Sequence, residues 1–298
     1  MTGNFDIKQH MKELDEMYNS THYVPFKIEI IDYDKPIQFG NTVIRKMTGD
    51  EIFEFLGIKE AVIDENGRPG DIILRNVDSS THESVPHELF GALYLIEFQN
   101  NKEFHSNNSI LLSAFRIYRT GDVFAPWAYT KGRLSISYSH PEFTNYQVIY
   151  RIKEKEINDV YSIYKRLTES TSEKTKLIIE RFNNAIASTT SLQNCFVELT
   201  SILESILVNE SFELRFRFSL YGAFILSQIG ESKFSVKELQ KIYDIRSQLI
   251  HTGKSTKYTE GELDSLREIS IKLIKWYIFN DDKKNYVKEL VYEKLGIK

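Results

Sequence analysis

The sequence has few of the residues that mark disulfide-rich, fibrous or disordered proteins. Its 298 residues include one cysteine, 6 prolines and 14 glycines. The single cysteine, Cys195, cannot form a disulfide within the chain and excludes any metal site built of cysteines alone. The scarcity of proline and glycine, with 41% hydrophobic and 27% charged residues, excludes a collagen-like or low-complexity chain. This composition is typical of a globular protein with one large domain or two ordinary ones.

Long apolar runs and a secretory leader are missing as well. The longest apolar runs, Gly91 to Ile96 and Ile110 to Phe115, are far shorter than the ~18 residues that a membrane-spanning helix needs. Residues 1 to 20 carry acidic and basic side chains where a signal peptide would be apolar. We therefore expect a cytoplasmic protein that does not enter a membrane, with Cys195 as a small core residue.

The net charge of −4 is unevenly distributed along the chain. Residues 1 to 150 hold 14 basic and 21 acidic residues, a balance of −7, which leaves 24 basic and 21 acidic residues, a balance of +3, for residues 151 to 298. The second part is therefore the better candidate for an anionic partner, although +3 alone is a weak electrostatic signal.

Residues 1 to 150 have a mixed periodicity. Short alternating runs at Phe26 to Ile30 and Leu134 to Tyr138, with turn signals between them, predict strands. Thr48 to Leu56 is predicted to be helical, because Thr48 and Glu51 have the spacing of a capping box. We predict a variable α+β amino-terminal domain here, with a possible role as a sensor or in RNA binding. Trp127 and Tyr129 could stack on bases, but packing in a hairpin is the preferred interpretation.

From residue 151 to residue 298 the apolar period is 3.6, which predicts an all-helical bundle and an α+β fold class for the whole chain. Thr259 and Glu262 have the spacing of a second capping box. The expected helical stripes are Ile157 to Leu167, Leu177 to Ile186, Leu192 to Ile206, Phe212 to Ala223 (with Phe216 and Leu220), Val236 to Ile250, Leu263 to Tyr277 and Tyr286 to Val291.

The helix predicted from Ser235 to about Ile250 carries an arginine on its apolar stripe. A rotation of about 100° per residue places Arg246 within ~20° of the centre of that stripe. A desolvated guanidinium without a partner costs several kcal/mol, so Arg246 must meet a carboxylate, a second subunit or a bound anion. Glu204 and Glu213 are the candidate carboxylates. His251 follows at the end of the helix, where Gly253 is expected as a left-handed cap.

An arginine and a histidine together suit the cleavage of RNA without a metal ion. A histidine with a pKa near ~6.5 can take the proton of a ribose 2′-hydroxyl or give one to the leaving 5′-oxygen. Arginine can hold the phosphate and stabilise the more negative transition state. The spacing itself is a weak signal, because about one match is expected by chance. Arg75 with His82 and Arg133 with His140 also match, and exposed strand ends or loops are the preferred interpretation there.

Three segments of the helical part resemble the Apea-like branch of the HEPN family, whose members are all-helical bundles with the signature Arg-x(4 to 6)-His. The segments are Leu203 to Leu207, Glu213 to Ser219 and Ile242 to His251, in that order. A weaker resemblance at Ala114 to Tyr118 is similar to the variable amino-terminal domain that this branch often carries. The resemblance covers residues 155 to 280 well and residues 40 to 150 loosely.

The resemblance implies a metal-independent endoribonuclease that acts as a homodimer, typically in antiviral defence or toxin systems. Arg246 and His251 of two protomers would face each other across the dimer cleft as the catalytic residues. The residues expected to support them are Glu213, Arg217, Tyr243, Asp244 and Ser247. For Glu213 and Arg217, four residues apart, a surface ion pair is the alternative.

Two other interpretations stay open. The bundle could be a catalytically silent HEPN scaffold for dimerisation and nucleotide or RNA binding, with Arg246 as a phosphate clamp. Alternatively, the first part of the chain could sense a phage or cellular component and restrain the second part. The expected partners are RNA, a second copy of the chain and an antitoxin or phage-derived trigger. No cofactor and no metal ion is expected, since neither proton transfer by histidine nor charge stabilisation by arginine requires one.

Overall fold

The computed structural model describes residues 12, 20–31, 35–48, 51, 58–60, 72–75, 82–85, 93–98, 104–123, 127–130, 133–136, 146, 148, 150–169, 172–187, 189–208, 211–280 and 286–296. The chain forms two compact units that interleave in sequence. The first contains Met1–Ser109, Val123–Glu142 and Ile149–Ile157; the second contains Ile110–Asp122, Phe143–Val148 and Asn158–Lys298. Whereas the sequence suggested one boundary after residue 150, the second unit also includes two segments upstream of it. None of the helices in the described ranges is long and apolar enough to cross a membrane.

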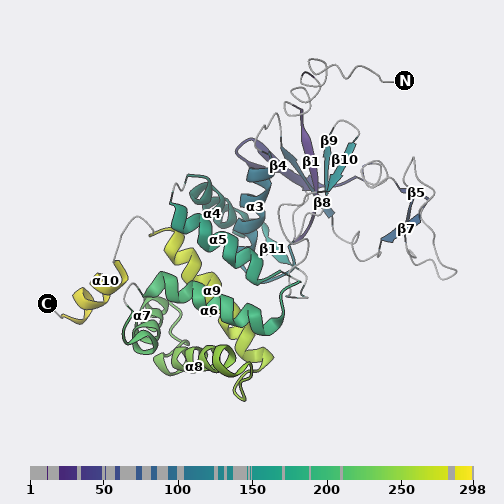
Figure 1. The fold of residues 1–298 in the computed structure, drawn as a ribbon. Helices are drawn as coiled ribbons and strands as arrows, with labels where there is room; N and C mark the ends of the chain where they lie inside the picture. The colour runs from purple at the N-terminus through teal and green to yellow at the C-terminus, as the bar shows by residue number, and fades with distance from the viewer. Residues whose placement is uncertain are drawn as a thin grey trace. The chain divides into compact units, whose positions relative to one another are not determined.

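The first unit is built on a six-stranded antiparallel sheet (Figure 1). Its strands lie in the order β10 (Arg133–Ile136), β9 (Trp127–Thr130), β1 (His22–Lys27), β8 (Leu93–Phe98), β4 (Thr42–Lys46) and β3 (Ile37–Phe39). Val24, Ile96 and Ile44 form one cross-strand row, and all three side chains are fully buried. Successive residues of a strand point to opposite faces, so this row marks the core face of the sheet. Tyr23 and Glu97 of the next row are partly exposed on the opposite face.

Two smaller groups of strands complete the first unit. β5 (Ile58–Glu60), β6 (Ile72–Arg75) and β7 (His82–Val85) form an antiparallel sheet. β2 (Glu29–Ile31) pairs in parallel with β11 (Arg151–Lys153). The prediction of helix from residue 151 onward is therefore wrong for 151–153, because buried Ile152 pairs with buried Ile30.

The strands expected between residues 26 and 30 and from residue 134 are present in the first unit. Ile28 separates β1 from β2, and β9 and β10 form the hairpin that was preferred for Trp127 and Tyr129. Tyr138, at the end of the second predicted run, lies outside the described residues.

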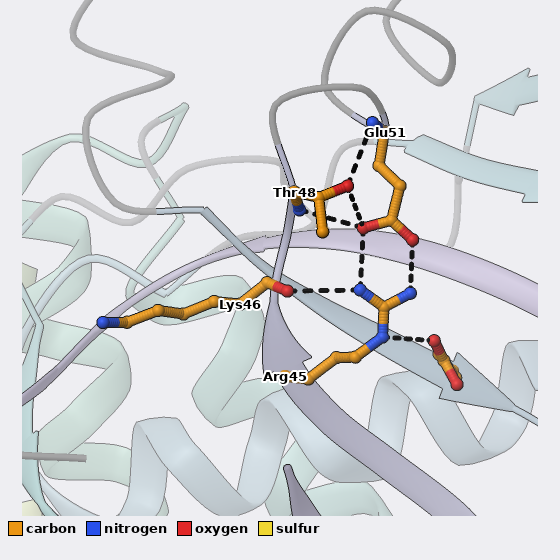
Figure 2. Close-up of polar contacts among 5 residues, drawn as sticks. Arg45, Lys46, Thr48 and Glu51 are labelled. Carbon is orange, nitrogen blue, oxygen red and sulfur yellow. Dashed lines mark hydrogen bonds and ion pairs between the residues drawn. The ribbon is translucent and has the colours of Figure 1, made fainter. Parts of the chain in front are cut away.

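Arg45, on β4, ties the start of the next segment to the sheet (Figure 2). Its guanidinium contacts both oxygens of Glu51, with Nη1 to Oε2 at 2.7 Å, and its Nε donates to Glu97 Oε1 on β8 at 2.6 Å. Glu51 also accepts the N–H of Thr48 at 2.9 Å, while the Thr48 hydroxyl accepts the N–H of Glu51 at 3.3 Å. This reciprocal pair confirms the predicted capping box. The expected helix over residues 52–56 lies outside the described residues.

The second unit is helical. It includes part of α3 (Phe104–Tyr118) and most of α4 (Ile157–Glu169). A short 3-10 turn, η2 (Glu154–Glu156), precedes α4. The other helices of the unit are α5 (Glu173–Ala185), α6 (Leu192–Leu207), α7 (Leu214–Gln228), α8 (Val236–Thr252), α9 (Glu260–Ile278) and α10 (Tyr286–Leu295). Each helix from α4 to α10 coincides with a predicted stripe. α6 packs against α5, α7, α8 and α9, and α7 packs against α8 and α10 (Figure 1). The fold is α+β, as predicted, and mostly helical. Cys195 on α6 is fully buried in the core, as expected.

A buried polar network joins α3 to the helices of the second unit. Arg116 is 1% exposed and donates from Nη1 to Asn183 Oδ1 on α5 at 3.1 Å. Asn183 Nδ2 in turn donates to Ser113 Oγ at 2.9 Å. Burial lowers the pKa of Arg116 to about 10, although the neighbouring Tyr146 and Asp122 oppose this shift. The segment that weakly resembled an amino-terminal domain thus belongs to the helical unit from Ile110 onward.

The buried face of α7 differs from the predicted stripe. Phe212 and Phe216 were expected in the core but are 56% and 53% exposed. The buried residues of α7 are Arg217, Phe218, Ser219, Tyr221, Gly222, Ile225 and Leu226. A Cβ at Gly222 would lie 3.0 Å from Leu239 on α8 and 3.2 Å from Leu207 on α6. The prediction was wrong because this close approach at Gly222 turns a different face of α7 inward.

The predicted capping box of α9 is half formed. The Thr259 hydroxyl accepts the N–H of Glu262 at 3.2 Å. The Glu262 carboxylate pairs instead with Lys241, which links α9 to α8. A cross-helix ion pair has therefore replaced the second hydrogen bond of the box.

We expect Arg45→Met to destabilise the sheet of the first unit by about 1 to 2 kcal/mol at pH 7. The hydrogen bond from Arg45, assisted by Thr48, lowers the pKa of Glu51 to about 2. Since this folded-state pKa lies below the unfolded value near ~4.3, the contribution is present above that pH and is lost as the pH falls towards 2. The loss caused by Arg45→Met should therefore shrink below about pH 4.

Hydrogen exchange of peptides covering β4 and β8 measures this effect. Arg151→Met is the matched control, because it removes an exposed pair with Glu29 on the same unit. That pair should be worth no more than ~1 kcal/mol. Equal losses in the two variants at every pH would contradict the assigned role of Arg45.

Candidate active site

Helix α8 begins and ends as its sequence predicts. The Ser235 hydroxyl accepts the N–H of Glu238 at 3.3 Å, and the Glu238 carboxylate accepts the N–H of Ser235 at 2.5 Å. At the other end, Gly253 has a φ of 70° and donates its N–H to the Leu249 carbonyl at 3.0 Å. This left-handed conformation favours glycine, which confirms Gly253 as the cap. His251 lies in the last turn of α8 and is exposed.

Arg246 lies at the edge of the buried face of α8. That face consists of Leu239, Ile242, Ile245 and Leu249. Ile245 was absent from the predicted stripe, so Arg246 is displaced from the central position expected for it and its side chain is 22% exposed. Of the two carboxylates suggested for Arg246, Glu204 on α6 faces it, with Nη2 3.8 Å from Oε2.

The ion pair between Arg246 and Glu204 is loose. A separation of 3.8 Å is longer than a hydrogen bond. Arg246 Nε and Glu204 Oε2 are both buried, and neither has a hydrogen-bond partner among the described residues. The arrangement leaves the guanidinium donors of Arg246 available for an anionic ligand.

Tyr243 lies one turn before Arg246 and completes the cluster. The Arg246 Cζ atom is 5.7 Å from the centroid of the Tyr243 ring, which also packs against Phe218 of α7 at 5.5 Å. Burial raises the pKa of Tyr243, and the charge of Glu204 and a hydrogen bond to that carboxylate raise it further, while Arg246 lowers it. Tyr243 therefore remains neutral at neutral pH, with its hydroxyl beside the Glu204 carboxylate.

Asp244, an expected supporting residue, contacts α7. Arg215 donates to both of its carboxylate oxygens, Nε to Oδ1 at 2.7 Å and Nη2 to Oδ2 at 3.0 Å. The hydrogen bond from Arg215 lowers the pKa of Asp244. Ser247, also expected as a supporting residue, directly follows Arg246 and is partly exposed. The contacts of Asp244 thus link two helices and do not involve Arg246.

Glu213 and Arg217 form a separate cluster at the start of α7. Arg217 Nε lies 3.8 Å from Glu213 Oε2, and Arg217 Nη1 donates to the Tyr221 hydroxyl at 3.4 Å. The Arg217 Cζ atom also lies 4.2 Å from the centroid of the Phe212 ring. Arg217 is 8% exposed, which is more buried than the alternative of a surface ion pair implies.

His251 and Arg246 occupy different sides of α8 within one chain. Five residues separate them, which corresponds to a rotation of about 140° around the helix. Arg246 is directed to Glu204 on α6, whereas His251 is exposed beyond the core contacts. Within one chain, the structure brings together Arg246, Glu204 and Tyr243, and it does not place His251 in contact with them.

No family model matches the chain, and neither the curated proteins nor the solved structures include one that matches it. The HEPN resemblance thus stays a prediction from the three sequence segments.

The two competing Arg and His pairs differ from the pair on α8. Arg75 ends β6 and His82 begins β7, where they are cross-strand partners. This position agrees with the preferred strand-end interpretation. Arg133 begins β10, and His140 lies outside the described residues. Among the side chains that the structure describes, no group of three or more His, Cys, Asp or Glu is placed to hold a metal ion.

The loop after α8 carries two lysines that were not predicted as site residues. The Thr252 hydroxyl donates to the Lys254 carbonyl at 2.7 Å, and the Ser255 hydroxyl donates to Gln248 Oε1 at 2.7 Å. These contacts fix a loop on which Lys254 and Lys257 are exposed. The available signal was two lysines within six residues of His251.

We expect a double-mutant cycle of Asp244→Asn and Arg215→Met to give a coupling energy of about 0.5 to 1 kcal/mol, the range for a partly exposed bidentate pair. Each single variant should lower the free energy of unfolding of the helical unit. The double variant should lower it only slightly more than either single variant does. Urea titration followed by circular dichroism measures the three losses. Additive losses would contradict a structural role for this pair and return Asp244 to the candidate site.

Proposed function

We propose that the protein is a metal-independent endoribonuclease of the HEPN type that acts as a homodimer, with Arg246 and His251 as catalytic residues. The observation that carries the proposal is the state of Arg246. Its nearby carboxylate is 3.8 Å away and its buried Nε has no hydrogen-bond partner among the described residues. A phosphate offers the paired oxygens that a guanidinium fork binds best.

The proposed reaction is attack by the ribose 2′-hydroxyl on the adjacent phosphorus. A histidine removes the 2′-proton as the new P–O bond forms, and a protonated histidine gives a proton to the 5′-oxygen as the old P–O bond breaks. Arg246 balances the additional negative charge of the crowded transition state. The products are a 2′,3′-cyclic phosphate and a 5′-hydroxyl, with no redox change.

Dimerisation is proposed because Arg246 and His251 point to different sides of one α8. Exposed apolar side chains on α8 and at the start of α7 support an interface: Phe212 and Phe216 are more than half exposed, and Ile250, next to His251, is 47% exposed. Apolar side chains of this size in water are typical of surfaces that bind another protein.

RNA is the proposed ligand on the basis of charge near α8. Lys254 and Lys257 are exposed on the fixed loop after His251, and the chain from residue 151 onward has a balance of +3. Such lysines contact phosphates without reading sequence. The family resemblance further suggests antiviral defence or a toxin system, with an antitoxin or a phage-derived trigger as an additional partner.

The alternative is a catalytically silent HEPN scaffold that uses Arg246 as a phosphate clamp. The loose environment of Arg246 favours both functions equally, because a clamp needs only the guanidinium. His251 distinguishes them, since an exposed histidine contributes to proton transfer but adds little to a clamp.

We expect His251→Ala to lower the rate of RNA cleavage in EDTA by ~10² to 10⁴-fold while changing RNA affinity and folding little. Arg246→Ala should lower both rate and affinity, because it removes the phosphate contact. Arg246→Lys keeps the charge but loses the fork, so it should restore affinity better than rate. Rates on a labelled oligonucleotide and affinities on its uncleavable 2′-O-methyl analogue measure these effects.

Two outcomes decide between the functions. Equal cleavage by the wild type and a folded His251→Ala variant would end the catalytic interpretation. Binding of the 2′-O-methyl oligonucleotide by a wild type that cuts no RNA would favour the silent scaffold.

A further inference from the structure

The carboxylate that faces Arg246 is largely buried and yet lies beyond hydrogen-bond distance from it. Both Glu204 and Arg246 have side chains that are only 22% exposed, yet they remain 3.8 Å apart. Arg215 and Asp244 are more exposed, at 49% and 30%, and still approach to 2.7 Å. A buried carboxylate oxygen without a hydrogen bond costs free energy, so Glu204 gains from any closer approach of Arg246.

We infer that Glu204 is an internal competitor for the phosphate that Arg246 binds, and that it thereby determines which ligands the site accepts. This inference rests on the proposed function. A carboxylate and a phosphate both present paired oxygens to a guanidinium, so they compete for the same donors. Arg246 must leave Glu204 when RNA arrives.

Tyr243 keeps Glu204 from following Arg246 onto the ligand. Its ring packs against Phe218 with the ring centroids 5.5 Å apart, and its hydroxyl interacts with the Glu204 carboxylate. We expect this contact to hold the carboxylate on the α6 side of the cluster when Arg246 turns to a ligand. Without the Tyr243 hydroxyl, Glu204 could close on Arg246 and compete more strongly.

Competition from Glu204 makes the site select polymeric anions over small ones. Free phosphate can offer only the contact with Arg246, which Glu204 opposes. An RNA strand adds contacts to exposed lysines such as Lys254 and Lys257, which Glu204 does not oppose. The free energy needed to separate Arg246 from Glu204 is the same for the bound substrate and for the transition state. Glu204 should therefore affect KM and leave kcat unchanged.

The test compares Glu204→Gln with the wild type in binding a fluorescent 2′-O-methyl oligonucleotide. Gln removes the negative charge but keeps an oxygen that accepts from Tyr243. We expect the affinity to rise by up to about fivefold, as loss of a competing ion pair worth ~1 kcal/mol allows. KM should fall by a similar factor with kcat within twofold. Tyr243→Phe should shift the affinity in the opposite direction.

Glu198→Gln is the matched control on the same helix. Glu198 pairs with Arg181 at 3.0 Å, away from Arg246, so this variant should bind RNA as the wild type does. Unchanged or weaker binding by folded Glu204→Gln would overturn the inference. A lower kcat at unchanged affinity would overturn it as well, because Glu204 would then position Arg246.

A second readout separates this inference from the proposed function. The reaction of Arg246 with phenylglyoxal, followed by peptide mass spectrometry, does not depend on RNA. If the wild type neither binds nor cuts RNA, the proposed function fails, and the reactivity of Arg246 decides the competition with Glu204. Faster modification of Arg246 in Glu204→Gln but not in Glu198→Gln supports the competition, and equal rates overturn it.

Discussion

The guanidinium of Arg246 lies at the edge of a helical core and makes only a loose ion pair there, with Glu204. The account of the site depends on this constraint. Three other arginines make close hydrogen bonds: Arg45 contacts Glu51 and Glu97, Arg215 makes two bonds to Asp244, and Arg116 donates to Asn183. Arg246 instead has a carboxylate at 3.8 Å and a buried Nε without a hydrogen-bond partner in the described parts of the chain. Since an unsatisfied buried donor costs free energy, the cluster is more stable once an anion completes it.

The positions of Arg246 and His251 on α8 are the basis for the proposal of a dimer. Arg246 is directed to α6, whereas His251 is exposed at the carboxyl end of the same helix. Under the proposed function, the histidine that moves protons at a phosphate held by Arg246 belongs to another copy. Phe216 on α7 and Ile250 on α8 are exposed apolar side chains.

The period of the apolar residues predicted the helices well, because one face of each helix is buried. The capping residues Ser235 and Gly253 also predicted where α8 begins and ends. Periodicity failed where burial depends on the partner: Gly222 lets α7 approach α6 and α8, which turns Phe216 outward and brings Arg217 inward. In the site, the pairing of Arg246 with Glu204 was among the alternatives that the sequence offered, but the 3.8 Å separation was not. Such distances depend on how α6 and α8 pack, and spacing within one helix carries no information about them. The HEPN resemblance, the dimer and the nuclease activity remain predictions.

Mixing the inactive variants Arg246→Ala and His251→Ala tests the central claim most directly. After subunit exchange, verified by light scattering and native mass spectrometry, each mixed dimer retains one Arg246 and one His251 on different chains. The account predicts that the mixture cuts RNA in EDTA and leaves 2′,3′-cyclic phosphate ends, whereas neither variant does so alone. A mixture that exchanges subunits and stays inactive, while the wild type cuts RNA, would contradict a site shared between two copies.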